Sequence, residues 1–189
     1  MPKPPLLPTI DWKEVFESGL TYQAWLEGGK HPQIQEKMEA ARRELPLGPH
    51  VEALLATLPR PVHVVAIAED WCGDVARHVP VLARLAAGAP NLRARYLHRE
   101  SRPDVFARFL TNGGESIPKF IFLNDQLVEC GNWGPMPAAC RELIARGKAR
   151  GKTGEARGRV SVCYEADPHC QVAVRELLEL IDIASTQSI

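Results

Sequence analysis

The chain has 189 residues, of which 45% are hydrophobic and 24% charged, and 23 basic side chains balance 23 acidic ones. This composition is ordinary for a globular protein with a full core, and it lacks the net positive charge that favours nucleic acid or an anionic membrane. No apolar run approaches the roughly 18 residues of a membrane span, and the proline-rich start has too short an apolar stretch for a secretory signal. We therefore expect a cytoplasmic protein that binds neither nucleic acid nor membrane, and the sequence indicates no particular oligomeric state.

Residues 1–59 are predicted to form a helical extension that packs on the rest of the chain. Asp11 is a typical helix N-cap, and Trp12, Val15 and Phe16 follow it on one helical face. Apolar residues recur at helical spacing in three further segments before Pro61. The helices expected in the extension cover residues 11–19, 21–26, 32–45 and 49–58.

After Pro61 the pattern changes to strands that alternate with helices. Residues 62–68 are a nearly continuous apolar run, as in a central strand covered on both faces. Pro118 lies at the start of another apolar strand, and the turn Asn124-Asp125-Gln126 predicts a hairpin to the strand after it. The elements expected here are strands over 62–68, 92–98, 116–123 and 127–130, helices over 73–87, 103–111 and 136–146, and a loop over 131–135.

The C-terminal part begins with a basic, glycine-rich stretch over 146–159. Such runs rarely fold, so we expect a solvated linker over 148–159, with an anion- or RNA-binding strip as the alternative. Residues 160–165 alternate in polarity like a strand at a sheet edge, and Asp167 is a good cap for a helix after it. A strand and a helix are therefore the expected tail, over 160–189.

Five cysteines with irregular spacing make a poor disulfide framework and indicate reduced thiols. There is no CxxC pair, so we expect no metal or other cofactor, although His169 and Cys170 lie near Cys163 in the sequence. Cys163 and Cys170 are expected to pack the tail. Without a functional role, Cys130 and Cys140 are expected to pack as small buried hydrophobic residues.

Cys72 differs from the other cysteines because it lies between the apolar run 62–68 and the start of a helix. Unpaired N–H groups and the helix dipole stabilise a thiolate there, and the thiolate is the reactive form. Asp74 caps the same helix favourably but opposes the thiolate through its charge. We therefore expect a thiol that is only moderately acidified.

The sequence resembles the thioredoxin superfamily over residues 60–147. The resemblance rests on Glu69-Asp70-Trp71-Cys72-Gly73, on Ser116-Ile117-Pro118 at the start of a strand, and on the loop 131–134 before a helix. It also resembles a bacterial subgroup with an Asp-Trp-Cys-Gly-Asp signature. The resemblance implies an α/β fold with a central mixed sheet flanked by helices, to which the helical extension and the C-terminal strand and helix are added.

The resemblance also implies roles around Cys72, which matches the attacking cysteine. Pro118 matches the proline that is cis in this superfamily, and the Ile117 backbone would pair with a bound peptide. Trp71 would shield the thiol, and Trp133 with Gly134 would form part of the rim that contacts partners. The residues expected to contact the substrate are Trp71, Gly73, Asp74, Ile117, Pro118, Trp133 and Gly134.

Two positions depart from a typical thioredoxin. Val75 stands where the second cysteine of a CxxC motif would be, and Ala66 stands where thioredoxins keep a buried acid. Cys130 is a candidate resolving cysteine from across the site. His78 lies more than a helical turn from Cys72 on a different face, so it is not expected to act as a base.

These features lead to two functional hypotheses. In the first, Cys72 is the single attacking cysteine of a thiol oxidoreductase that acts on protein disulfides or a low-molecular-weight thiol, and an external thiol releases it. In the second, the chain is a non-catalytic module that binds a protein or peptide along the Ile117 backbone.

Overall fold

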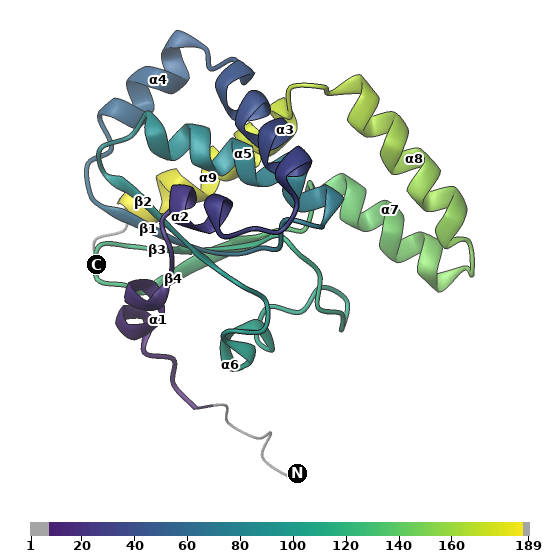
Figure 1. Cartoon of the computed structure of the whole chain (residues 1–189), viewed down its shortest axis with the longest axis horizontal. Coiled ribbons are helices and arrows are strands. Elements are labelled where there is room, and N and C mark those ends of the chain that lie inside the picture. The colour runs from purple at the N-terminus through teal and green to yellow at the C-terminus, as the bar shows by residue number, and fades with distance from the viewer. Residues whose placement is uncertain (1–7, 187–189) are drawn as a thin grey trace.

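The structure is a computed structural model that describes residues 8–186, so most of the proline-rich start lies outside the described residues. Its centre is a four-stranded sheet in the order β2-β1-β3-β4 (Figure 1). The strands are β1 (Val62–Ile67), β2 (Leu92–Leu97), β3 (Lys119–Leu123) and β4 (Glu129–Trp133). β1 and β2 are parallel, whereas β3 is antiparallel to both β1 and β4, so the sheet is mixed. The expected fold class and the expected hairpin are confirmed.

Helices cover both faces of this sheet. On one side lie α1 (Trp12–Ser18) and the short α6 (Pro103–Phe106), and on the other α5 (Gly73–Ala87) and α9 (Gln171–Thr186) (Figure 1). Phe16 of α1 meets His63 of β1 edge-on at 4.9 Å between ring centroids, which fixes α1 on the first face.

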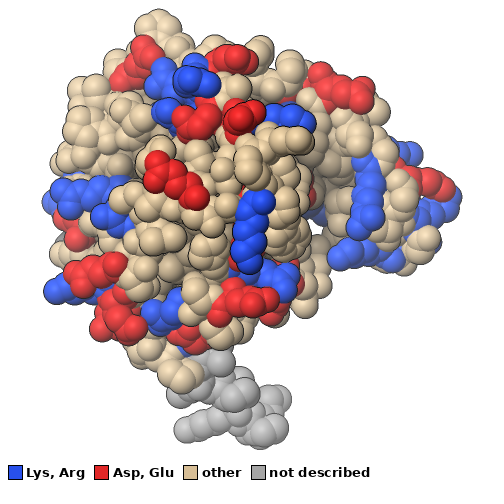
Figure 2. Space-filling model, viewed as in Figure 1, with Lys and Arg blue, Asp and Glu red and all other residues tan. Residues whose placement is uncertain are grey.

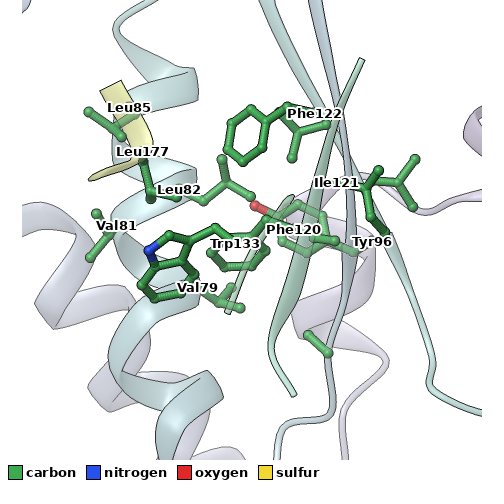
Figure 3. Packing of buried hydrophobic residues seen from close by; sticks show 14 of the residues in the cluster. Val79, Val81, Leu82, Leu85, Tyr96, Phe120, Ile121, Phe122, Trp133 and Leu177 are labelled. Carbon is green, nitrogen blue, oxygen red and sulfur yellow. The ribbon is translucent and has the colours of Figure 1, made fainter. Parts of the chain in front are cut away.

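The second face packs its aromatic side chains against α5 and α9. Trp133 of β4 stacks on Phe120 of β3 at 5.4 Å between ring centroids. Figure 3 shows the side chains of Leu82 from α5 and Leu177 from α9 around these two rings. The apolar stripes of α5 and α9 face the sheet and bury the side chains on this face.

The N-terminal helices pack on the sheet and on α5. The helices α2 (Tyr22–Glu27), α3 (Pro32–Glu44) and α4 (Pro49–Ala56) follow α1. Trp25 of α2 stacks on Tyr96 at 5.5 Å, and Leu20 pairs through its backbone with Tyr96 at the β2 edge. The cap expected at Asp11 is confirmed, because its carboxylate accepts the Glu14 N–H.

Residues 138–166 form a helical hairpin that projects from the body (Figure 1), in place of the expected linker and strand. Its helices are α7 (Ala138–Ala149) and α8 (Thr153–Ala166). The predicted strand over 160–165 is wrong because Ala156 and Val160, one helical turn apart, bury their side chains, whereas Val162 is 64% exposed. The basic segment folds because these apolar residues have α7 to pack on.

The main core continues beyond residue 147, where the boundary of the expected domain lies. Val174, Leu177 and Ile181 of α9 belong to the same buried cluster as the sheet, whereas Cys140 of α7 belongs to a smaller one with Met136 and Val160. The helix that closes the sheet is therefore α9, and α7 stands away from it. The loop expected over 131–135 is shorter than predicted, because Gly131 to Trp133 continue β4.

Candidate functional site

Cys72 is the N-cap residue of α5 and lies at the end of the loop that leaves β1. Its half-buried thiol donates a hydrogen bond to the carbonyl oxygen of Ile117, with 3.6 Å between the sulfur and the oxygen. The Ile117–Pro118 peptide bond is cis. The structure thus brings together Cys72, Ile117 and Pro118, which are far apart in the sequence.

The surroundings of Cys72 do not acidify the resting thiol. Burial raises its pKa and outweighs the backbone N–H groups of Asp74 and Val75, and the Asp74 carboxylate raises it further. The sequence predicted moderate acidification from the helix start, and that prediction is wrong because it left out the burial of the sulfur.

Asp74 is bound to the hairpin and does not act as a side-chain cap of α5. Its Oδ1 accepts a 2.8 Å hydrogen bond from the hydroxyl of Tyr164 in α8. The guanidinium of Arg77 lies 4.2 Å from the centre of the Tyr164 ring and donates to the Tyr164 carbonyl oxygen. Burial raises the pKa of Asp74, against the lowering effects of Tyr164 and Arg77. Tyr164 was missed from sequence because its segment was assigned to a strand.

A cleft of about 300 Å³ opens beside the Cys72 thiol. Trp71, which is 54% exposed, and Ile117 line its wall on the body side. The opposite wall belongs to the α7–α8 hairpin and carries three cationic side chains, Arg141, Lys148 and Arg157. Figure 2 shows several lysine and arginine side chains on the visible face of this hairpin, among uncharged and acidic ones.

Two residues expected on the rim of the site have other roles. Trp133 is only 3% exposed, and its indole N–H donates to Glu176 Oε2 of α9 at 2.6 Å, so it cannot contact a partner in this structure. Gly134 is buried at φ +119°, and a Cβ there would lie 2.0 Å from the carbonyl oxygen of Pro118. Gly134 therefore lets the backbone pass against Pro118. By contrast, no heavy atom lies within 4 Å of a Cβ at Gly73.

Cys130 lies at the wrong end of the sheet to resolve Cys72. It falls in β4 at the bulge opposite Phe122 and Leu123, whereas Ile117 precedes the other end of β3. An extended strand of this length, from Ile117 to Leu123, spans about 20 Å. A disulfide needs Cα atoms about 4.4–6.8 Å apart. The prediction that Cys130 is a resolving cysteine is therefore wrong.

Glu69 and Asp70, which precede Trp71, anchor the loop that carries Cys72. Asp70 is 7% exposed, and its Oδ2 accepts the backbone N–H groups of Lys30 and His31 at 2.6 and 2.8 Å. Its Oδ1 lies 3.0 Å from Nδ1 of His31. Glu69 accepts the backbone N–H of Arg99 at 2.7 Å. Asp70 thus ties the loop to the segment between α2 and α3, and Glu69 ties it to the residues after β2, which the motif alone does not indicate.

The histidine on the Cys72 helix is occupied elsewhere. His78 is buried, contacts the rings of Trp133 and Tyr164, and lies with Nε2 at 3.3 Å from the Tyr164 hydroxyl. Burial lowers its pKa to about 3, and Arg77 adds to this effect. His78 is therefore neutral at ordinary pH. Among residues 8–186 no group of three or more metal-ligating side chains comes together.

The sheet order, the helix that starts after Cys72 and the strand that starts after Pro118 define a protein of the thioredoxin-fold class. The chain belongs to the thioredoxin family, because the family model for thioredoxin matches residues 19–150. This match begins at residue 19, among the N-terminal helices, whereas the motifs alone indicated a resemblance that starts at residue 60.

Two solved structures are similar to this chain in fold. One is a protein of unknown function from Pseudomonas aeruginosa, with a TM-score of 0.69 and 18% identity, covering 92% of this chain and 98% of that one. The other is an HIV epitope-scaffold, with a TM-score of 0.68, 18% identity and the same two coverages, 92% and 98%. A search of curated proteins gives no match. At this identity the likeness concerns the fold alone.

Proposed function

We propose that the protein is a thiol oxidoreductase that uses Cys72 as its single attacking cysteine. The observation that carries the proposal is the Cys72 thiol, which faces the Ile117 carbonyl beside cis-Pro118 and opens onto a cleft. Val75, three residues on, is fully buried and carries no thiol, so the motif supplies an attacking group without a second one. The proposal places the protein in the cytoplasm, where thiols are kept reduced.

The proposed reaction has two exchange steps. The Cys72 thiolate attacks one sulfur of a substrate disulfide, a mixed disulfide forms, and the other substrate sulfur leaves as a thiolate that takes up a proton. An external thiolate then attacks the substrate sulfur of the mixed disulfide. This second step releases a new disulfide and returns Cys72 to the thiolate.

The raised pKa of Cys72 sets the pH dependence of the first step. Only the thiolate attacks, so the rate of mixed-disulfide formation should increase with pH to a midpoint above the ordinary value for cysteine. The same proton loss breaks the hydrogen bond to Ile117 and leaves that carbonyl oxygen open to a donor on the substrate.

The cleft favours a substrate that carries negative charge. Three cations from the hairpin face it, Arg141, Lys148 and Arg157, against the acidic side chains of Asp74 and Glu115. Its volume of about 300 Å³ is at the lower end for small-molecule sites. An acidic low-molecular-weight disulfide fits both observations, and a disulfide-bearing segment of an acidic protein is the larger alternative.

Treatment of the reduced protein with oxidised glutathione tests this function. We expect a glutathione adduct at Cys72, found by mass spectrometry, that persists until an external thiol is added. Cys72→Ser should lose this adduct, and the matched variant Cys130→Ser should keep it. If the Cys72→Ser variant formed the same adduct as the wild-type protein, the proposal would be contradicted.

A second candidate function is a binding module without catalysis. Two observations favour it: Trp71 is 54% exposed beside the cleft, and burial raises the pKa of the Cys72 thiol. An exposed aromatic ring is a common anchor in protein interfaces. In that case Trp71→Ala would abolish partner capture and Cys72→Ser would not, whereas an oxidoreductase needs Cys72 to hold its partner as a mixed disulfide.

A further inference from the structure

The α7–α8 hairpin contains a pair of thiols that the proposed reaction does not use. Cys140 on α7 is 4% exposed, Cys163 on α8 is exposed, and neither is in a disulfide. Both cysteines line the same small cavity, and Cys163 is among the groups that raise the pKa of Cys140, so the two side chains are neighbours across the hairpin. The sequence predicted only packing roles for both residues.

The register of the hairpin places this pair on the contact face of both helices. Near the tip, a Cβ on Gly147 would lie 2.4 Å from the Cβ of Ala156, so the two backbones approach closely. Cys140 and Cys163 each lie seven residues, or two helical turns, from that contact, in opposite directions along the chain. Val160 lies between the two contacts and packs in the same small cluster as Cys140.

A disulfide between the two cysteines requires Cα atoms about 4.4–6.8 Å apart. The close approach of the two backbones at Gly147 favours such a separation across the hairpin. A cavity of about 140 Å³, lined by both cysteines together with Arg77 and His78, adjoins the pair. A small oxidant can therefore reach the pair from the solvent through Cys163 or from this cavity.

We propose that Cys140 and Cys163 are a reversible redox pair, which a hydroperoxide oxidises to a disulfide that fastens α8 to α7. The exposed Cys163 attacks the peroxide oxygen, becomes a sulfenic acid and releases water in the case of hydrogen peroxide. Cys140 then attacks the Cys163 sulfur, and the second oxygen leaves as water. Two thiols and one peroxide thus give one disulfide and two waters.

Cys163 is the attacking residue in this order because the surroundings hold Cys140 in the thiol form. Burial raises the pKa of Cys140 to about 11, and Cys163 and Glu176 add to the increase, whereas Arg77 lowers it. The buried thiol therefore acts second, on a neighbouring sulfur that is already activated.

The proposed disulfide would also act on the cleft beside Cys72. Tyr164 follows Cys163 directly and donates its hydroxyl hydrogen to Asp74, two residues from Cys72. Arg141 and Arg157, from the two helices that the disulfide would join, line the cleft. Oxidation would thus fix the cationic wall in place.

The test uses the full-length Cys72→Ser protein, so that its result does not depend on the function proposed for Cys72. Treatment with one equivalent of hydrogen peroxide should remove two hydrogen atoms from the intact mass. Peptide mapping should then give a cross-linked pair that contains Cys140 and Cys163, and dithiothreitol should reverse it.

Two further variants in this background make the outcome decisive. Adding Cys163→Ser should abolish the cross-link, whereas Cys130→Ser should leave it unchanged. The cross-linked protein should also unfold at a higher temperature than the reduced protein, because the disulfide closes a loop. Over-oxidation of Cys163 without a cross-link, a cross-link through Cys170, or no reaction at all would each overturn the proposal.

Discussion

The reactivity of Cys72 is set by a balance among its immediate neighbours. The N–H groups at the start of α5 favour the thiolate, whereas burial and the Asp74 carboxylate favour the thiol, and the second group prevails. Tyr164 holds Asp74 in place by a hydrogen bond, so this acid is a fixed part of the site. The position of a cysteine at a helix start therefore does not by itself decide its pKa.

Replacing Asp74 by asparagine should make the thiol more reactive. In Asp74→Asn the side-chain oxygen can still accept from Tyr164, but the charge that raises the pKa of Cys72 is gone. We expect the pH midpoint for alkylation of Cys72 by iodoacetamide to fall, with a rate gain on the order of two- to tenfold at neutral pH. Glu129→Gln, on β4, is the control and should change neither quantity. An unchanged midpoint in Asp74→Asn would show that burial alone sets the pKa.

Replacing Asp70 should destabilise the fold in a pH-dependent way. Burial alone would raise its pKa, but the hydrogen bonds from His31 and Lys30 lower it overall. A lowered folded-state pKa contributes stability above the unfolded-state pKa, and that contribution is lost as the pH falls through the folded-state value. Asp70→Ala should cost about 1–3 kcal/mol of unfolding free energy at neutral pH, because two backbone N–H groups lose their acceptor.

Chemical denaturation at neutral pH and in acid measures this difference. The gap between wild type and Asp70→Ala should narrow in acid. Asp104→Ala removes an exposed ion pair with Arg102 and should cost only about 0–1 kcal/mol. Equal losses in the two variants would contradict the role given to Asp70.

At the scale of single elements, the turn between β4 and α7 depends on one glycine. Gly134 has a φ of +119°, and its backbone passes close to the Pro118 carbonyl oxygen. The carbonyl oxygen of Gly134 accepts a 3.0 Å hydrogen bond from the ammonium group of Lys119. Both the start of β3 and the exit from β4 therefore rely on a residue without a Cβ.

Substitution of this glycine should be costly where another glycine of the site is tolerant. Gly134→Ala should lower the unfolding free energy by roughly 1–3 kcal/mol or more, since both the dihedral angle and the available space oppose a side chain. Gly73→Ala, in the first turn of α5 with open space around it, should be neutral or slightly stabilising. Urea unfolding curves of the two variants give the comparison, and a tolerated Gly134→Ala would refute this account of the turn.

Local sequence patterns predicted the helices and strands near Cys72 well and the α7–α8 hairpin poorly. Cys72, Ile117 and Pro118 could be placed because each lies at a strand or helix start that neighbouring residues define. The alternation of Val160, Val162 and Tyr164 suggested a strand, but Ala156 and Val160 also fit a helix. The presence of α7 as a packing partner decides between the two, and a local pattern does not contain that information.

For the whole molecule, the choice of the helix that closes the sheet is a long-range competition. Both α7 and α9 have apolar side chains at helical spacing, so either could cover Phe120 and Trp133. The structure assigns α9, whose Leu177 and Ile181 are fully buried, and the bond from Trp133 to Glu176 fixes it. The sequence therefore predicted the fold class but put Trp133 on the rim, because the helix that buries it comes forty residues later.

The contribution of α9 to the core can be measured directly. Leu177→Ala should lower the unfolding free energy by about 2–5 kcal/mol, as expected for a large-to-small change in a core. Val162→Ala, at a side chain that is 64% exposed on α8, is the matched control and should stay within about 0.5 kcal/mol. Similar small losses for both variants would mean that α9 is only loosely attached to the sheet.

The central claim is that Cys72 attacks disulfides as a single cysteine, without a second cysteine that resolves the mixed disulfide. It is tested most directly by the pH dependence of its reaction with oxidised glutathione, followed by mass spectrometry on the reduced protein. The account predicts a lasting mixed disulfide at Cys72, formed faster than at any other cysteine, with a midpoint above the ordinary cysteine pKa of about 8.5. A Cys72 that reacts no faster than the other four cysteines, or that passes into an intramolecular disulfide, would contradict it.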